Sequence, residues 1–333
     1  MIRRLAILTA VAAAVAVGAP SLHAYLKLGY ELNGRLVGLS WTKPVGYLIT
    51  NRNVTGVTAA QLQSAVAGAL GVWASPSNVQ LSSQFLGFTN LDPDVDDGFT
   101  VIGFRSRPDL DRTLGATSFE IDAVTGQFIA ADIFLNSFFE WSAAANGDST
   151  RFDVASVVTH EIGHLLGLGH SALGETEPRS GGGRLVLGKR AVMFPIAYPR
   201  GSVLDRSLQA DDIAGITDIY GDADAERELG AISGRVTLNG AGVFGAHVTA
   251  FNSATGDLVS GFSLNSNGEF VIAALVPGVY IVRVEPLDDA DIDGFFDEDF
   301  PPNLNFRVSY YTKQVAVPKG GTSGSIEIKV RAK

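Results

Sequence analysis

Three histidines and a glutamate fall within one short stretch of this 333-residue chain. The stretch reads His160-Glu161-Ile162-Gly163-His164-Leu165-Leu166-Gly167-Leu168-Gly169-His170. On a helix, His160 and His164 are one turn apart, so both imidazoles project from the same face. Neutral imidazole is a good zinc ligand, and two ligands on one rigid helix are well preorganised. The spacing therefore predicts a metal site.

A third ligand is expected to come from the chain just beyond this helix. Gly167 can adopt a left-handed conformation, which would end the helix and let the chain return His170 to the metal. Three protein ligands leave one coordination position open for water, as in catalytic rather than structural zinc sites. We therefore expect one catalytic Zn²⁺, held by His160, His164 and His170.

Glu161 has the position of a general base. It is next to the first ligand but would point away from the metal-binding face of the helix, where it could activate a zinc-bound water and pass a proton to the leaving amine. The alternative is a helix with ordinary histidines and no metal. Because five fixed positions of an extended motif match, we favour the metal site.

The surrounding pattern predicts the elements that would hold this site. Thr58 and Gln61 form a capping-box pattern, and apolar residues then recur at helical spacing until Pro76. Two further helices are expected at residues 153–166 and 209–220. Strand candidates rich in β-branched and aromatic residues occupy residues 46–50, 79–85, 99–104, 114–121 and 128–135. This order is typical of an α+β domain with a mixed sheet and three helices.

The sequence pattern changes after residue 221. Residues 222–230 are rich in acidic side chains and are interpreted as a linker. Beyond them, short strand-like runs alternate with turn signals such as Asn239-Gly240 and Asn267-Gly268, and no helical period follows Tyr220. Residues 231–333 are therefore expected to form an all-β sandwich.

The N-terminus indicates an exported protein. Residues 1–24 have two arginines, an apolar run and small residues, which is the layout of a signal peptide. Residues 25–40 have no clear period and are expected to be a short N-terminal segment. No later segment is apolar enough to span a membrane. With no cysteine, the chain has neither a thiolate ligand nor a disulfide, and its net charge of −10 makes nucleic acid an unlikely partner.

The histidine stretch and several further runs resemble the metzincin metallopeptidases. Ser171, which follows the last histidine, points to the matrixin branch, and Pro195 argues against the astacin and serralysin branches. The other matrixin-like features are Trp41, Ala131-Asp132-Ile133 before Trp141, Ala191-Val192-Met193-Phe194-Pro195, and the run from Leu208 to Gly221. Together they span most of residues 41–221, which we interpret as a zincin-like catalytic domain.

The resemblance implies roles for further residues. Met193 would be the Met-turn residue beneath the metal, and Asp211 or Asp212 would help to hold that turn. The strand at residues 114–121 would be the edge strand along which an extended peptide binds. The substrates would then be proteins or peptides, and the protein would be a monomer.

The sequence also departs from the family. Phe134 and Phe139 stand where animal matrixins have ligands for a structural zinc and for calcium, so that second zinc is expected to be missing. A cysteine switch is impossible in this chain, and what controls latency is open. The link from His170 to Met193, residues 171–192, is longer than the family norm and has no assigned role.

Residues 233–286 resemble the carboxypeptidase regulatory-like, or transthyretin-like, β-sandwich. The residues that carry the resemblance are Ser233-Gly234-Arg235-Val236-Thr237, Gly268-Glu269-Phe270-Val271 and Leu275-Val276-Pro277-Gly278-Val279-Tyr280. This fold hosts many roles and implies an accessory module without chemistry of its own.

Two acidic clusters could bind Ca²⁺ or could be solvated loops. Asp289, Asp291, Asp293 and Asp297 match a calcium loop, but Phe300 replaces its last carboxylate ligand, so we favour a solvated loop. The cluster of Asp92, Asp94 and Asp96 is a weaker candidate.

Two functions are consistent with this sequence. The first is a secreted, extracellular or cell-surface zinc endopeptidase, with a tail that could be removed without loss of the catalytic fold. The alternative is an extracellular binding or adhesion protein with a metallopeptidase fold that does not cleave. The presence of Glu161 favours the enzyme, because a non-cleaving protein has no need of that base.

Overall fold

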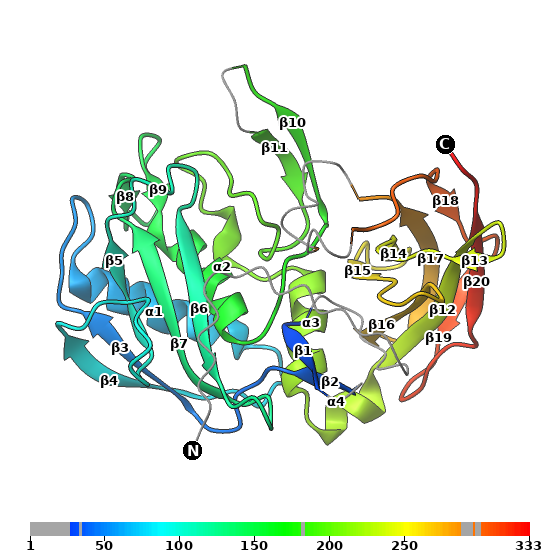
Figure 1. Ribbon diagram of the computed structural model, residues 1–333, viewed down its shortest axis with the longest axis horizontal. Helices are drawn as coiled ribbons and strands as arrows, with labels where there is room; N and C mark the ends of the chain where they lie inside the picture. The colour runs from blue at the N-terminus through cyan, green and yellow to red at the C-terminus, as the bar shows by residue number, and fades with distance from the viewer. Residues whose placement is uncertain (1–26, 33–34, 181–183, 288–295, 297–300) are drawn as a thin grey trace.

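The computed structural model describes residues 27–32, 35–180, 184–287, 296 and 301–333. The predicted signal peptide at residues 1–24 lies outside these residues, as does nearly all of the predicted calcium loop. Figure 1 shows two parts side by side. The first part, up to Tyr220, contains a sheet and helices, and the second part, from Gly230 onward, is rich in β-strands. No helix in the described part of the chain combines the length and the apolar character that crossing a membrane requires.

The first part is built on a mixed, five-stranded sheet. Its strand order is β4-β3-β5-β7-β6, in which only β6 runs antiparallel to its neighbour, so β6 forms one edge as the resemblance implies. The five strands are β3 (Val45–Thr50), β4 (Ser83–Thr89), β5 (Val101–Arg105), β6 (Gly115–Ile121) and β7 (Phe128–Asn136).

One predicted strand is shifted along the chain. The strand expected at residues 79–85 begins only at Ser83 and runs to Thr89. Val79 instead forms an isolated bridge with Gly221, and the N–H of Gln80 donates to the carbonyl of Tyr220. The start of this run therefore pairs with the end of a helix rather than with the sheet.

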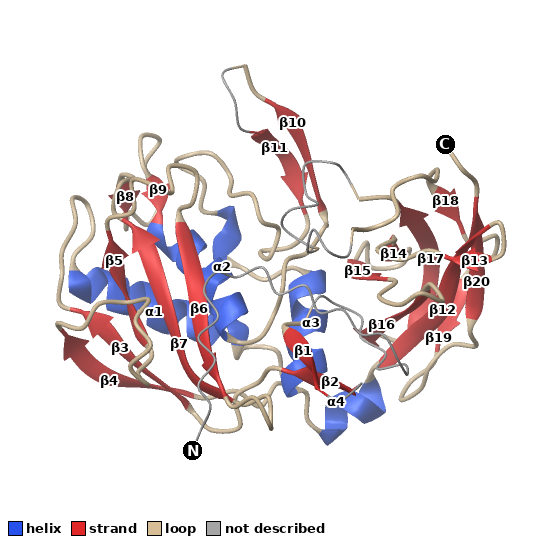
Figure 2. Cartoon of the chain, viewed as in Figure 1, coloured by secondary structure: helices blue, strands red, loops and turns tan. Residues whose placement is uncertain are grey.

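Helix α1 (Ala59–Trp73) forms as its sequence pattern predicts. Thr58 caps it, and the reciprocal bonds with Gln61 make a complete capping box. The apolar face buries Leu62, Val66 and Trp73 against the sheet and α2. Both helices cover the same face of the sheet (Figure 2), so this face holds the core of the first part.

Helix α2 (Val154–Leu165) carries the first two histidines and is anchored at both ends. Its N-cap Asp153 accepts the N–H of Ser156 at 2.8 Å and pairs with Arg206 at 2.5 Å. At the other end, Trp41 donates its indole N–H to the carbonyl of Leu165. These bonds occupy backbone groups that a helix leaves without partners at its ends.

Short elements complete the first part. The segment before residue 41, which has no clear sequence period, forms a hairpin from β1 (Gly29–Leu32) and β2 (Arg35–Gly38). The long link after His170 forms a second hairpin, β10 (Gly174–Pro178) and β11 (Arg184–Lys189), which projects from the molecule (Figure 1). The remaining elements are β8 (Trp141–Ser142), β9 (Phe152–Asp153) and the 3₁₀ helix η1 (Leu204–Arg206).

The three helices expected before residue 221 form, but the expectation that no helix follows Tyr220 is wrong. After α3 (Ala210–Tyr220), a fourth helix, α4 (Ala223–Glu228), lies inside the predicted linker. Asp222 caps it by accepting the N–H groups of Asp224 and Ala225, and Ala225 is buried. A helix this short has no visible period, because it shows only one turn and a half.

The second part consists of two packed sheets, as the turn spacing predicts. One sheet contains β12, β13, β16 and β20, and the other contains β14, β15, β17, β18 and β19, with an apolar core of residues from both. The strands are β12 (Gly230–Leu238), β13 (Ala241–Gly242), β14 (His247–Asn252), β15 (Leu258–Phe262), β16 (Glu269–Leu275), β17 (Gly278–Glu285), β18 (Ser309–Tyr310), β19 (Val315–Val317) and β20 (Ile326–Val330).

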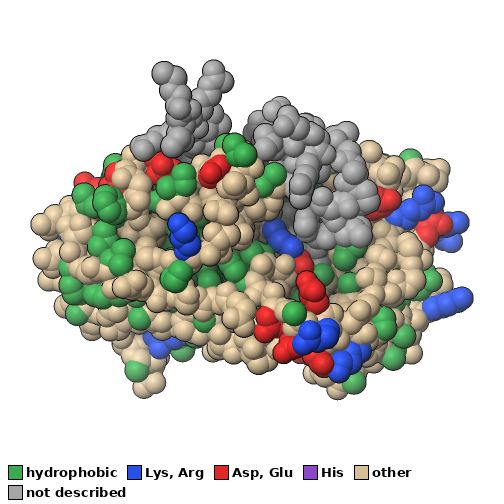
Figure 3. Space-filling view, turned by 90° about the horizontal axis from the view of Figure 1, so that it is seen from below, with side chains coloured by type: hydrophobic (Ala, Val, Ile, Leu, Met, Phe, Trp, Pro, Cys, Tyr) green, Lys and Arg blue, Asp and Glu red, His purple; other side chains and the backbone are tan. Residues whose placement is uncertain are grey.

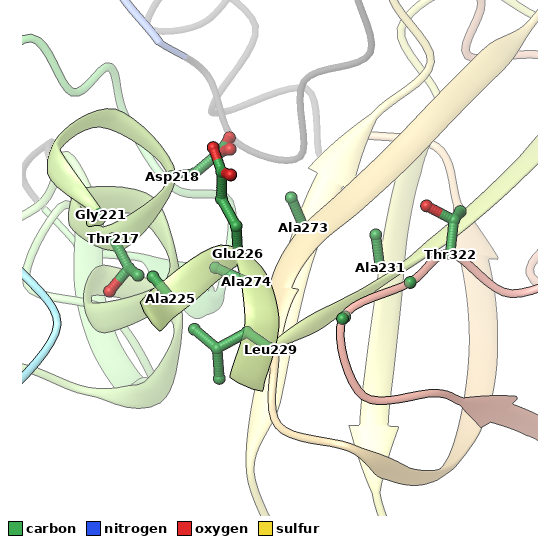
Figure 4. Close-up of a pocket in the computed structure, with 13 residues that line it drawn as sticks. Thr217, Asp218, Gly221, Ala225, Glu226, Leu229, Ala231, Ala273, Ala274 and Thr322 are labelled. Carbon is green, nitrogen blue, oxygen red and sulfur yellow. The ribbon is translucent and has the colours of Figure 1, made fainter. Parts of the chain in front are cut away.

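The two parts are in close contact through α3. Ala214 belongs to the core cluster of the sandwich, and Ala210 packs against that cluster, so a helix of the first part contributes to the core of the second. A cavity of about 310 Å³ lies beside this contact, between α3, α4 and the sandwich; Asp218 and Glu226 are among its lining residues (Figure 4). Figure 3 shows acidic and basic side chains next to one another on one surface of the molecule.

We predict that Asp153 contributes more to stability than an ordinary helix cap. Asp153→Ala should lower the free energy of unfolding by about 2–4 kcal/mol, because it removes a cap and leaves Arg206 without its carboxylate. Asp153→Asn should cost less, since it keeps an acceptor for Ser156. The control Thr58→Ala removes an exposed cap and should cost about 1 kcal/mol. Urea unfolding measures all three, and equal losses for both alanine variants would contradict the prediction.

Candidate metal centre

The structure brings the three predicted ligands together. His160 and His164 lie on α2, His170 lies on the chain beyond it, and one nitrogen atom from each falls within 4.8 Å of the other two. The Nε2 atoms of His164 and His170 are 3.2 Å apart. Within the residues that the structure describes, this is the one group of three such side chains close enough to hold a metal.

The first two imidazoles are held in one orientation by backbone carbonyls. Nδ1 of His160 lies 2.8 Å from the carbonyl oxygen of Val192, and Nδ1 of His164 lies 2.8 Å from that of Leu168. A carbonyl oxygen only accepts, so each Nδ1 carries the proton and each Nε2 keeps its lone pair. Each of the two rings thus offers one nitrogen to the shared centre.

Burial keeps these rings neutral. It lowers the pKa of His164 to about 3, and it lowers that of His160 well below its ordinary value, in both cases helped by the neighbouring histidines. Neutral imidazole is the form that binds a metal.

The geometry fits zinc. Zn–N bonds of about 2.0–2.1 Å in tetrahedral geometry place two ligand nitrogens about 3.3 Å apart. The 3.2 Å between the Nε2 atoms of His164 and His170 matches this value, and all three ligand nitrogens lie within 4.8 Å of one another. Three nitrogen donors with no sulfur or carboxylate in the set are the donor type of a catalytic zinc site.

His170 reaches the centre because the chain reverses directly after α2. Gly167 has a φ of +98°, and a Cβ there would come 2.5 Å from the carbonyl oxygen of Leu39, so only glycine fits. The N–H of Leu168 then closes back on the carbonyl of Gly163. This left-handed turn is the one expected from the position of Gly167.

Met193 lies directly beneath the histidine helix. It is fully buried, and a Cβ added to Gly163 would come 2.2 Å from its sulfur, so the contact needs a glycine on the helix. Asp212 holds this turn, since its carboxylate accepts the N–H groups of Val192 and Met193 at 2.8 and 3.1 Å. Burial raises the pKa of Asp212 to about 6, which leaves it mainly ionised at neutral pH. Of the two aspartates expected to hold the turn, Asp212 is therefore the one that bonds to its backbone N–H groups.

Glu161 is buried between α2 and the edge strand β6. Its Oε2 accepts the hydroxyl of Thr117 at 2.8 Å, and Gly115 of the same strand leaves room for Oε1. Burial raises the pKa of Glu161 to about 7 against the effect of that hydrogen bond.

The sequence analysis did not identify Thr117, because nothing in a strand pattern indicates which residue faces a helix from another part of the chain.

A buried ion pair near the centre was also missed. The ammonium of Lys189, at the base of the β10–β11 hairpin, lies 2.7 Å from a carboxylate oxygen of Asp205 in η1 and over the ring of Tyr198. Its side chain is only 3% exposed. The pair connects the projecting hairpin to the body of the first part, and no local sequence signal links two such distant residues.

The aspartates near the sheet that were considered as calcium ligands or as part of the family resemblance bind protein groups. Asp92 and Asp94 pair with Arg52 and Arg105, which supports a loop stabilised by arginines rather than a calcium site. Asp132 accepts the N–H groups of Val95 and Val101 and so holds this loop to the sheet.

The two phenylalanines that the resemblance places at further metal positions make contacts of other kinds. Phe134 has the guanidinium of Arg107 over its ring. Phe139 packs edge to face against Phe152.

Comparisons with known proteins agree with this site. Residues 40–177 match the matrixin family, and residues 231–288 match the carboxypeptidase regulatory-like domain. The matrixin match contains His160, Glu161, His164 and His170.

Three curated relatives are metalloendoproteinases from plants. The chain is 44% identical over 69 residues to Metalloendoproteinase 1-MMP of Arabidopsis thaliana, covering 21% of this chain and 14% of that protein. It is 41% identical over 83 residues to Metalloendoproteinase 1 of Glycine max, covering 23% and 22%. A longer match, 28% identical over 168 residues, is to Metalloendoproteinase 2-MMP of Arabidopsis thaliana and covers 48% and 37%. The chain thus spans well under half the length of these relatives.

We predict that the purified chain holds about one zinc ion, because the described residues offer one three-histidine centre. Elemental analysis after removal of loosely bound metal measures the ratio. His164→Asn should abolish the bound zinc. The control His247→Asn changes a buried histidine of the sandwich and should keep it. A ratio near two, or retention of zinc in His164→Asn, would show that the ligand set is wrong.

Proposed function

We propose that this chain, with its matrixin domain and its carboxypeptidase regulatory-like domain, is a zinc-dependent endopeptidase. The observation that carries the proposal is the combination of three converging neutral imidazoles with a buried carboxylate beside them. His160, His164 and His170 would hold the metal. When bound, zinc lowers the pKa of a water ligand and polarises the carbonyl of the scissile bond.

Glu161 would act as the general base and then as the general acid of the reaction. Its pKa of about 7 suits a group that must both accept and release a proton at neutral pH. In the proposed reaction, Glu161 accepts a proton from the attacking water and then delivers it to the amine nitrogen as the peptide bond breaks. The hydroxyl of Thr117 orients the carboxylate, because it bonds to only one of the two carboxylate oxygens.

The edge strand β6 supports a peptide as the substrate. β6 pairs with β7 along one side, while no other strand of the described residues pairs with its other side. An extended peptide could therefore add to β6 through main-chain hydrogen bonds. Thr117 and Gly115 lie on this strand and touch Glu161, so a peptide aligned there would pass close to the base.

The β10–β11 hairpin would form part of the rim of the substrate site. It begins four residues after His170 and ends four residues before Met193, so both of its ends are tied to the metal centre. Lys189 and Asp205 fix the base of the hairpin, while the strands β10 and β11 project from the molecule (Figure 1). We propose that this hairpin contributes to the choice of substrate.

Export of the protein is also proposed. Residues 1–24 have the layout of a signal peptide, which supports an extracellular or cell-surface location. We propose a catalytic domain at residues 41–221 and a β-sandwich at residues 231–333, joined by the segment that contains α4.

The decisive variant is Glu161→Gln. It should retain zinc, because Glu161 is not one of the three ligands, while kcat/KM on unstructured peptides falls by at least about 10³-fold. Peptide hydrolysis followed by mass spectrometry, together with elemental analysis, measures both properties. The control Glu228→Gln changes an exposed glutamate of α4 and should leave both unchanged.

Two results would count against the proposal. Loss of zinc in Glu161→Gln would mean that this carboxylate is a ligand or supports one. A wild-type chain that binds one zinc but cleaves no member of a random peptide library would favour a binding protein that does not cleave.

A further inference from the structure

We propose that the metal centre needs the C-terminal β-sandwich, because the sandwich positions the segment that carries His170. This inference rests on the proposed function. It identifies Asp211 and Ser260 as positioning residues that act through Ser171, the residue directly after the third ligand. The sandwich would then be more than an appended module, since the metal site would be complete only when the sandwich is docked.

A single buried carboxylate joins the two parts. One oxygen of Asp211, Oδ2, accepts the hydroxyl of Ser171 at 2.5 Å. The other, Oδ1, accepts the N–H of Ser260 in β15 at 2.7 Å and lies 3.3 Å from its hydroxyl. All three residues are at most 2% exposed, so water cannot replace either partner. The position of Asp211, and with it that of Ser171, therefore depends on strand β15.

The next residue along the chain also touches the sandwich. Ala172 packs against an apolar cluster whose buried members are Phe262, Leu287 and Phe296. Phe262 lies at the end of β15, two residues beyond Ser260. Two successive residues that follow His170 are therefore linked to the second part: Ser171 through the Asp211 carboxylate, and Ala172 through apolar packing.

The third ligand needs this support more than the other two. His160 and His164 stand on a helix, whereas His170 follows a left-handed turn. Beyond it, the N–H of Ser171 is bound to the carbonyl of Met193, and its hydroxyl is bound to Asp211. Metal affinity depends on how well the surroundings hold each ligand, and loss of such supporting contacts typically weakens binding by about 10- to 100-fold.

The test compares two buried serines of the sandwich in the full-length chain. Ser260 touches Asp211, whereas the hydroxyl of Ser263 donates to the carbonyl of Val243 within the sandwich. Ser260→Val should raise the apparent Kd for zinc about tenfold, because the larger side chain displaces the Asp211 carboxylate. Ser263→Val should lower the melting temperature similarly and leave that Kd unchanged. Competition with a chromophoric chelator measures Kd, and the pair Ser260→Ala and Ser263→Ala replaces the valines if either fails to fold.

Variants of the carboxylate complete the test. Asp211→Ala should also raise the zinc Kd about tenfold. Asp211→Asn should restore it toward the wild-type value, because an amide can bond to both Ser171 and Ser260. Rescue by the amide separates positioning from a general loss of stability.

The outcomes separate this inference from the proposed function. Equal zinc affinities in the Ser260 and Ser263 variants, with a wild type that cleaves peptides, would overturn the inference alone. A wild type that binds zinc without cleaving, but loses affinity specifically in Ser260→Val, would support the inference and count against the endopeptidase. A wild type that binds no zinc would overturn both.

Discussion

The site depends on one constraint: three imidazole nitrogens must be packed closely together inside the protein while remaining unprotonated. Positive charge on the rings would drive them apart, and water would hold each ring in many orientations. Two backbone carbonyls meet this requirement. Each accepts the Nδ1 proton of one ring, His160 or His164, and so holds that ring in one orientation with Nε2 unprotonated. Each carbonyl belongs to a segment beyond the helix, so the helix alone cannot make the site.

Much of the first part serves to place those two carbonyls. The carbonyl of Leu168 is available because Gly167 turns the chain directly after α2. The carbonyl of Val192 is available because Asp212 holds the N–H groups of the same turn, and Gly163 lets Met193 pack beneath the helix. A glycine, a methionine and an aspartate that bind no metal thus determine where the ligands point.

The sequence predicted that the three histidines converge next to a glutamate, and it predicted most elements, because these features depend on spacing within one element. His160 and His164 are one helical turn apart, and Thr58 with Gln61 is a complete local signal. The sequence could not predict contacts between distant segments, such as Thr117 with Glu161 or Lys189 with Asp205. It also placed Asp211 in the first turn of a helix, where acids are common, and so gave no reason to expect that a strand of the sandwich binds it.

The contact between Asp211 and Ser260 has a consequence that follows from thermodynamic reciprocity. If docking of the sandwich raises the affinity of the centre for its metal, then the metal must strengthen docking of the sandwich by the same factor. Metal supply and the association of the two parts would be linked equilibria. In surroundings poor in zinc, the chain would both lose activity and loosen at the junction, where proteases could reach it, so scarcity of the metal would also shorten the lifetime of the enzyme.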